Sequence, residues 1–286
     1  MNSTKLASIG LAVALAAVLP AVPAQAGAAR TFVSAIGSDS NNCTNVATPC
    51  RHLATAFAAT TADGEIYVLD PANYGSLTIT HGVSIEGHGW ASIAPAGAGA
   101  AAIIISAGPT DKINIIGVVL DGTAIANTLG IEFVAGGSLV VRDSVIRNFA
   151  DGLGFLPNAS SQLSVSNTLV SDNSSFGVAI SASGSAVASA DLDNVTMVNN
   201  ATSGLHALSS GGAPINVMVR NSTMAHNGEG LSSQGTSTTV WLTRSTITEN
   251  GTDYGTTGTS VFLSYGDNNI VGNTNTSGTP PLIGYK

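Results

Sequence analysis

The residues of this sequence best suited to catalysis are two carboxylates and a guanidinium, Glu132, Asp151 and Arg147. Glycoside hydrolysis needs a pair of carboxyl groups, one acting as general acid and the other as base or nucleophile. An arginine beside a carboxylate-bound Ca²⁺ would instead serve a β-elimination. If the chain is an enzyme, we predict these three residues as its catalytic set. A Ca²⁺ ion is expected only for the lyase chemistry, and otherwise neither a cofactor nor a structural metal is expected.

Four further side chains could contact a sugar through hydrogen bonds or through an aromatic ring. They are Asp172, His206, Glu229 and Trp241, and together they form the predicted glycan-binding set. A tryptophan combines a broad apolar face with a polar N–H, so it can serve as a platform for a sugar ring. Partial burial beneath a loop explains Trp241 equally well.

An internal repeat predicts the elements that position these side chains. From Gly137 onward the sequence follows the pattern apolar-x-apolar-x-Asn-Ser/Thr-x-apolar-x-x-Asn, as in residues 163–173 and 217–227. The first asparagine of the pattern is found at Asn167, Asn194 and Asn221. The second recurs in steps of 27, 27, 23 and 23 residues, at Asn173, Asn200, Asn227, Asn250 and Asn273. Periods of about 20 to 50 residues are typical of solenoids.

Each repeat contains three short runs in which apolar and polar residues alternate, separated by Asn, Gly and Ser. Alternation with a period of two predicts strands, and no repeat holds a run long enough to predict a helix. The repeat therefore predicts an all-β coil with three strands per turn and about nine coils in all. Coils stack at about 4.8 Å, so equivalent residues form columns. Both sets of asparagines are predicted to be structural ladders at the turns.

On the residues of this repeat, the sequence resembles the right-handed parallel β-helix superfamily typified by pectate and pectin lyases. Weaker early coils at 83–87, 103–105 and 113–122 extend the resemblance from about Ile66 to the C-terminus. The resemblance implies a right-handed parallel β-helix with a cap at its N-terminal end. It also implies that a polysaccharide lies along one outer strand face and its flanking loops. That face carries the column Glu132, Gly154, Ala179, His206 and Ser232.

The catalytic sets that the resemblance implies are incomplete. Polygalacturonase-like members carry an Asn-Thr-Asp motif, a doubled Asp, a Gly-His-Gly and an Arg-x-Lys, and this sequence holds only Gly87-His88-Gly89. His88 belongs to an early coil without the aspartates and is predicted to be a turn residue. Pectate-lyase-like members need basic residues in the groove, whereas beyond residue 26 the only lysines are Lys112 and Lys286.

These observations favour an exported, non-catalytic β-helix protein that binds glycans or forms part of the cell envelope or surface. Its expected partner is a polysaccharide or a cell-surface glycan, and a monomer is expected. The alternative function is that of a polysaccharide lyase or glycoside hydrolase of the pectin lyase-like fold. The net charge of −8, without any basic cluster, argues against a nucleic-acid partner. After residue 26 the sequence has no apolar run long enough for membrane insertion.

The N-terminal region predicts export and a cap. Lys5, an apolar run over 6–19 and Ala24-Gln25-Ala26 are typical of a signal peptide, predicted here for residues 1–26. The protein is therefore expected to be secreted, to the periplasm or beyond the cell. Outside the cytoplasm a close cysteine pair is usually oxidised, so Cys43 and Cys50 are predicted to form a disulfide.

The cap itself is predicted over residues 27–63, ahead of a β-helix over 64–286. Residues 49–60 are expected to form its helix, with Thr48 as a candidate N-cap and Pro49 at the first helical position. This start of the chain is similar to the N-terminal region of secreted bacterial β-helix repeat proteins.

Overall fold

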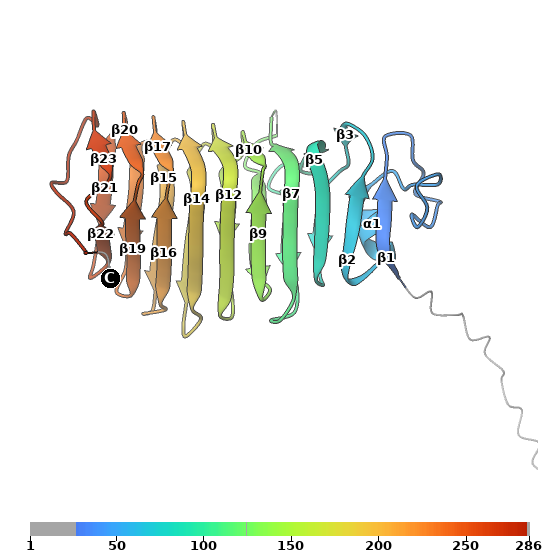
Figure 1. Ribbon diagram of the computed structural model, residues 1–286, viewed down its shortest axis with the longest axis horizontal. Coiled ribbons are helices and arrows are strands. Elements are labelled where there is room, and N and C mark those ends of the chain that lie inside the picture. The colour runs from blue at the N-terminus through green and yellow to red at the C-terminus, as the bar shows by residue number, and fades with distance from the viewer. Residues whose placement is uncertain (1–26, 124, 285–286) are drawn as a thin grey trace, which may run out of the picture.

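The structure is a computed structural model that describes residues 27–123 and 125–284. The predicted signal peptide lies outside these residues. Every pairing between the named strands is parallel, and the strands stack side by side along the length of the molecule (Figure 1). The described chain is thus an all-β parallel β-solenoid, as the repeat predicted. Among the described residues no helix is long and apolar enough to cross a membrane.

The larger of the two sheets has fifteen strands. Its main path is β1 (Ala28–Val33), β2 (Thr60–Val68), β5 (Val83–Ile93), β7 (Lys112–Asp121), β10 (Val145–Arg147), β12 (Ser161–Ser171), β14 (Ala188–Val198), β16 (Ile215–Arg220), β19 (Thr238–Thr243) and β22 (Val261–Ser264). Five short strands join this path at its sides: β3 (Ala72–Asn73), β9 (Ser138–Arg142), β17 (Thr223–Ala225), β20 (Thr246–Thr248) and β23 (Asn269–Val271).

The smaller sheet has eight strands. They are, in order, β4 (Leu77–Ile79), β6 (Ala101–Ser106), β8 (Leu129–Ala135), β11 (Asp151–Phe155), β13 (Phe176–Ser183), β15 (Ser203–Ser210), β18 (Glu229–Gln234) and β21 (Thr252–Thr256). Seven full turns separate the first of these eight strands from the last, slightly fewer than the nine coils predicted. The first coil lacks a strand in this sheet because α1 (Leu53–Ala59) lies between β1 and β2 and contacts the side of β4.

The core lies between the two sheets and consists of columns of apolar side chains. In the eight-strand sheet one inward column is formed by fully or almost fully buried residues on consecutive strands: Ile103, Ile131, Leu153, Val178, Leu205, Leu231 and Tyr254. Alternate residues of the same strands point outward, because side chains on a strand alternate between its two faces. The outer face of this sheet is therefore fixed by the register of the core.

The asparagines of the repeat form two columns of different character. Asn173, Asn200, Asn227 and Asn250 are buried, and each donates from Nδ2 to Oδ1 of the next asparagine, at 2.8, 2.9, 3.0 and 2.9 Å, the last reaching Asn273. The acceptor oxygens also receive backbone N–H groups, for example that of Asn200 on Asn227 at 2.9 Å. This column holds the turn that leads into the eight-strand sheet.

The column of first asparagines is exposed at the bend of the long strands. Asn167, Asn194 and Asn221 have φ angles of 50°, 56° and 51°, in the left-handed region that asparagine tolerates. Asn194 donates to Asn167 Oδ1 at 2.9 Å, but Asn221 donates to Asp193 at 2.6 Å instead of to Asn194. These asparagines shape a turn and have fewer hydrogen bonds than the buried column.

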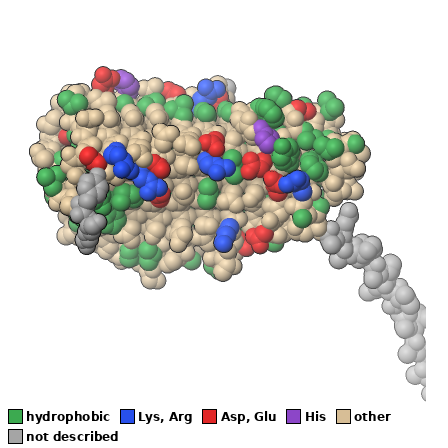
Figure 2. Space-filling view, viewed as in Figure 1, with side chains coloured by type: hydrophobic (Ala, Val, Ile, Leu, Met, Phe, Trp, Pro, Cys, Tyr) green, Lys and Arg blue, Asp and Glu red, His purple; other side chains and the backbone are tan. Residues whose placement is uncertain are grey.

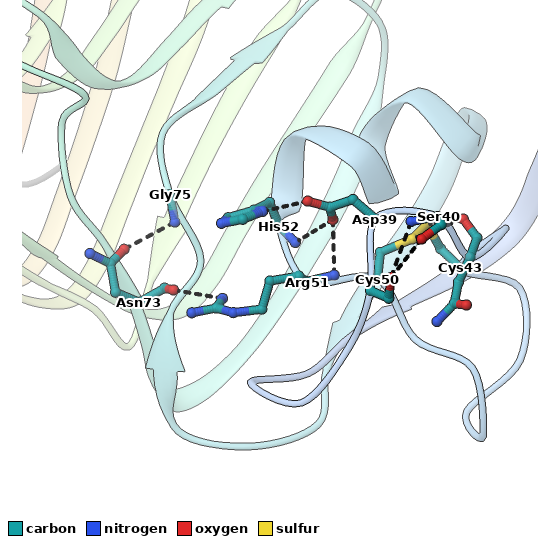
Figure 3. Close-up of polar contacts among 10 residues, drawn as sticks. Asp39, Ser40, Cys43, Cys50, Arg51, His52, Asn73 and Gly75 are labelled. Atoms are coloured by element: carbon teal, nitrogen blue, oxygen red, sulfur yellow. Dashed lines mark hydrogen bonds and ion pairs between the residues drawn. A yellow bond between two sulfur atoms is a disulfide. The ribbon is translucent and has the colours of Figure 1, made fainter.

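A disulfide joins Cys43 and Cys50 beside α1, which confirms the predicted pair (Figure 3). The helix begins at Leu53 with His52 as N-cap, so the predicted start at Pro49 is wrong by four residues. The cause is Asp39, whose Oδ1 accepts the backbone N–H groups of Arg51 and His52, each at 3.0 Å. These two hydrogen bonds keep the chain extended at His52, directly ahead of the helix.

The boundary predicted between cap and β-helix stays a prediction. Strand β1 falls in the segment 27–63, yet it already pairs with β2 in the fifteen-strand sheet, with Phe32 beside Tyr67. The sheet therefore starts before α1 in the sequence, and the helix covers the end of a solenoid whose first strand precedes it.

Candidate functional site

The outer face of the eight-strand sheet carries the column predicted for glycan contact. Strand pairing places the members of this column on consecutive strands: Glu132, Gly154, Ala179, His206, Ser232 and Gly255. Glycine and alanine stand between Glu132 and His206, so two coils of low relief separate the two polar side chains. The imidazole of His206 therefore lies near the middle of this column, next to the small residue Ala179.

His206 is half-buried on this face. Its ring stacks on the ring of Phe176 from the preceding coil, with 4.4 Å between centroids and 14° between planes. Burial lowers the pKa of His206 below its ordinary value, and the negative charge of Asp151 opposes this shift only in part. The imidazole is therefore neutral at neutral pH and can both donate and accept a hydrogen bond.

Glu229 lies one coil beyond His206 and is also half-buried. Burial raises the pKa of Glu229, hydrogen bonds from Ser232 and Ser203 oppose the shift, and the charge of Asp253 adds to it. Ser203 Oγ donates to Glu229 Oε2 at 3.4 Å. The carboxyl lies over Gly255 on the next coil, where any Cβ would overlap Oε1. Glycine at 255 therefore makes room for this carboxyl.

Glu132 and Asp151 lie on adjacent strands but three positions apart. Asp151 pairs with Leu129, while Glu132 pairs with Gly154. Three residues correspond to about 10 Å along a strand. Asp151 Oδ1 also accepts the backbone N–H of Phe176 at 3.2 Å, which holds it at the start of the face.

The structure does not bring Arg147 to these two carboxylates. Arg147 ends β10 in the fifteen-strand sheet and its Nε donates to Asp121 Oδ2 at 3.0 Å. Burial would raise the pKa of Asp121, but hydrogen bonds from Thr123, Asn148 and Arg147 hold it at about 2. Asp121 was missed by the sequence analysis, although Arg147 stands opposite it one coil later. Within the described residues no ion pair joins Arg147 to Glu132 or Asp151.

Asp172 and Trp241 also lie away from the His206 face. Asp172 is an exposed left-handed turn residue with φ 58° that accepts from Asn199 at 3.1 Å. It borders a shallow hollow of about 490 Å³ at the bend, together with Asn148 and Phe149. Trp241 is half-buried on β19, on the outer face of the other sheet beside Met218. Of the predicted glycan-binding set, His206 and Glu229 are the two that share a face.

The described residues contain no group of three or more His, Cys, Asp or Glu arranged to hold an ion. In this part of the chain, the Ca²⁺ of the lyase alternative therefore has no cluster of three such side chains to bind it.

The arrangement of coils and sheets is similar to that of solved structures. A pectate lyase, Pel9A, superposes with a TM-score of 0.58 over 87% of this chain and 78% of its own, at 14% sequence identity. This is the pectin lyase-like β-helix fold. Two mannuronan C-5 epimerase A-modules from Azotobacter vinelandii, AlgE6 and AlgE4, match 78% of the chain and 90% and 91% of their own, with identities of 14% and 13% and TM-scores of 0.38 and 0.34.

No protein-family profile matches the sequence, and no curated protein matches it significantly. At 14% identity, the likeness to the pectate lyase concerns the fold alone. The function of this pectin lyase-like β-helix therefore depends on its own side chains.

One contributor to the face of this pectin lyase-like β-helix escaped the sequence analysis. The ring of Phe176 stacks on that of His206, yet the equivalent position in the other coils carries Ala101, Leu129, Asp151, Ser203, Glu229 and Thr252. No conserved residue type marks this position of the repeat. The available signal was its place directly before the repeating glycine, where side chains stand at the start of the outer face.

Proposed function

We propose that this protein is an exported β-helix that binds a polysaccharide along the outer face of the eight-strand sheet without cleaving it. The observation that carries the proposal is the presence of two half-buried groups, His206 and Glu229, on adjacent coils, with the Glu229 carboxyl reaching over Gly255 in the column that contains His206. Burial lowers the pKa of His206 and raises the pKa of Glu229, and both shifts favour the uncharged form of the group. Groups of this kind hydrogen-bond hydroxyls without demanding a counter-charge.

The geometry of the face suits a sugar chain. The stacked rings of Phe176 and His206 offer an apolar surface for the C–H side of a pyranose. Glu229 lies on the next coil and can bond the ring hydroxyls, while Ser232 is buried and bonds the Glu229 carboxyl.

Export is supported by the cysteine pair and by the sequence of residues 1–26. A disulfide such as Cys43–Cys50 persists in oxidising compartments and is rare in the cytoplasm. The similar solved structure, Pel9A, is a pectate lyase, which gives a polysaccharide ligand some support by analogy of fold.

The absence of catalysis is proposed because the predicted catalytic set is split. Arg147 is engaged with Asp121 on the other sheet, and Glu132 stands about 10 Å along the strand from the position of Asp151. Neither the paired carboxyls of a hydrolase nor an arginine-assisted elimination is assembled by these residues.

A second candidate function, cleavage of a polysaccharide as a hydrolase or lyase, is favoured by one observation. A carboxyl with a raised pKa and a neutral imidazole are the forms that a general acid and a general base need near pH 7. The pKa of Glu229 is raised and that of His206 is lowered, and the two residues lie on adjacent coils, with Glu229 opposite Ser203, three positions before His206.

The test is a binding and turnover assay with a panel of soluble polysaccharides. His206→Asn should weaken binding at least tenfold, whereas His226→Asn should leave it unchanged because His226 pairs with Glu249 elsewhere, both side chains being exposed. The wild-type protein should release no product. If the wild-type protein releases product and Glu229→Gln abolishes that release, the second candidate function is established. If the polysaccharides bind equally well to wild type and to His206→Asn, the proposed binding face is wrong.

A further inference from the structure

The turn after Glu86 is enlarged compared with the same turn in the next coil. Glu86 of β5 pairs with Ile116 of β7, and Ala91 pairs with Val118. Residues 87–90 therefore stand opposite the single residue Gly117. Later coils pass this bend with one left-handed residue, such as Asn167 or Asn194. Insertions into one repeat of a solenoid often mark a binding surface.

Two glycines allow the inserted turn to lie close to the next coil. A Cβ on Gly87 would stand 2.5 Å from the backbone oxygen of Gly117, and a Cβ on Gly117 would stand 2.8 Å from the backbone nitrogen of His88. His88 itself has φ 55°, an uncommon value for a residue other than glycine. The backbone is thus packed against its neighbour while the side chains of His88 and Trp90 project outward, Trp90 with 44% of its surface exposed.

These side chains continue a row of rings on the outer face of the fifteen-strand sheet. The ring centroids lie 6.3 Å apart for Phe32 and Tyr67, 4.4 Å for Tyr67 and His88, and 5.4 Å for His88 and Trp90. Phe32 and Tyr67 are paired residues of β1 and β2. Figure 2 shows hydrophobic side chains and a histidine gathered over these coils, near the N-terminal end of the sheet. We call these four residues the aromatic patch.

The rim of the aromatic patch is polar and more acidic than basic. Arg30 bonds Glu65 at 2.5 Å, and its guanidinium lies 5.9 Å from the centroid of the Tyr67 ring. Glu86 stands beside Tyr67 on the next coil, and no ion pair engages it within the described residues. The rim thus contains two carboxylates, Glu65 and Glu86, and one guanidinium, that of Arg30, which Glu65 already binds.

We propose that the aromatic patch is a second saccharide site and that it takes a neutral glycan. Ring faces accept the C–H side of a sugar, while the Glu86 carboxylate, the His88 imidazole and Arg30 bond its hydroxyls. A chain of uronates would meet Glu65 and Glu86, so charge selects an uncharged ligand. The site lies on the other sheet from His206, and it stands or falls independently of the function proposed above.

The extent of the aromatic patch favours a glycan over a second copy of this chain. A stable protein interface buries about 800 Å² on each partner, whereas one aromatic side chain contributes about 150 to 250 Å² when fully buried. Phe32 and Tyr67 are already half-buried, so the four rings offer much less than a dimer needs. A contact of this size fits a few sugar units.

The test uses the fluorescence of Trp90 in the exported protein carrying Trp241→Phe, which leaves Trp90 as its one tryptophan. Soluble neutral polysaccharides, including galactomannan and mixed-linkage β-glucan, are titrated against polygalacturonate. At least one neutral polysaccharide should shift the emission, and polygalacturonate should not. In protein that keeps Trp241, Trp90→Ala should weaken binding of the same polysaccharide at least tenfold by calorimetry. Val261→Ala, with a side chain 40% exposed at the far end of the same sheet, should not.

Three results would overturn the proposal. They are an unchanged Trp90 emission with every neutral polysaccharide, a preference for polygalacturonate, and a dimer in sedimentation that Trp90→Ala converts to monomer. Because Trp90 reports locally, a failure here is distinguishable from a failure of binding at His206. Circular dichroism of the Trp90 and Val261 variants checks that both retain the fold.

Discussion

The backbone of Gly177 lies directly against the side-chain amide of Asn200 on the next coil: a Cβ at Gly177 would stand 2.9 Å from Asn200 Nδ2 and 2.6 Å from the oxygen of Gly204. The same contact recurs between Gly204 and Asn227. The glycine and asparagine columns of the repeat are therefore one structural device, since the buried amide needs the space that a side chain would fill.

Gly177→Ala should therefore destabilise the protein by about 2 to 4 kcal/mol, because neither neighbouring contact can move without breaking the ladder. Gly154→Ala is the matched control, since the nearest atom to a Cβ there is 3.7 Å away. Urea unfolding should place Gly154→Ala within about 0.5 kcal/mol of wild type. Equal stabilities for the two variants would show that the amide and glycine columns are not coupled.

The two asparagine columns should differ in their energetic weight. Asn200→Ala removes the hydrogen bonds that this side chain makes in the core to the amide and backbone N–H of Asn173 and to the backbone oxygen of Val170, and should lower the free energy of unfolding by about 2 to 4 kcal/mol. Asn194→Gly keeps the left-handed turn and removes one exposed bond, so it should cost less than about 1 kcal/mol. Thermal melts of both variants decide the matter, and a larger loss for Asn194→Gly would contradict it.

The repeat predicted much of this fold and less of the site. The strand register on the His206 face follows from the spacing of the asparagines and glycines, because identical turns put equivalent residues on top of one another. The partner of Arg147 did not follow, because Asp121 belongs to an early coil without the asparagine pattern. The start of α1 was misplaced because Asp39, in a distant loop, holds the N–H groups of residues 51 and 52.

The aromatic patch, too, could be predicted only in part from the sequence. Gly87-His88-Gly89 predicts a turn, and in the structure these residues form an irregular bend within β5, with His88 left-handed. That the turn is an insertion became visible only from the pairing of β5 with β7. The contact between His88 and Tyr67 depends on a coil that precedes the recognisable repeats.

Stability should depend on pH through Glu229. A raised pKa means that the folded protein binds this proton more tightly than the unfolded chain does. The resulting stability is fully present below the ordinary pKa of 4.5 and is lost as pH rises through the raised value. Glu229→Gln does not ionise, so its melting temperature relative to wild type should be higher at pH 7 than at pH 4. A relative shift that is the same at both pH values, or larger at pH 4, would contradict the assignment.

The disulfide should stabilise the N-terminal coil locally. Phe32 N donates to Cys43 O at 2.8 Å and Ser34 N donates to Cys50 O at 3.0 Å, so the bonded loop holds β1. Replacing both cysteines by serine removes a short cross-link worth about 2 kcal/mol. Hydrogen exchange of the Phe32 and Ser34 amides should accelerate while that of the central strand β14 stays unchanged. Acceleration spread evenly over all coils would argue against a local role.

Glycan binding along the outer face of the eight-strand sheet is tested most directly by hydrogen exchange with and without a polysaccharide that binds the protein. Protection should concentrate in β13, β15 and β18 and in the turns beside them, where Phe176, His206 and Glu229 lie. It should be lost with His206→Asn. Protection confined to the fifteen-strand sheet, or protection of β15 that survives His206→Asn, would contradict the proposed binding face.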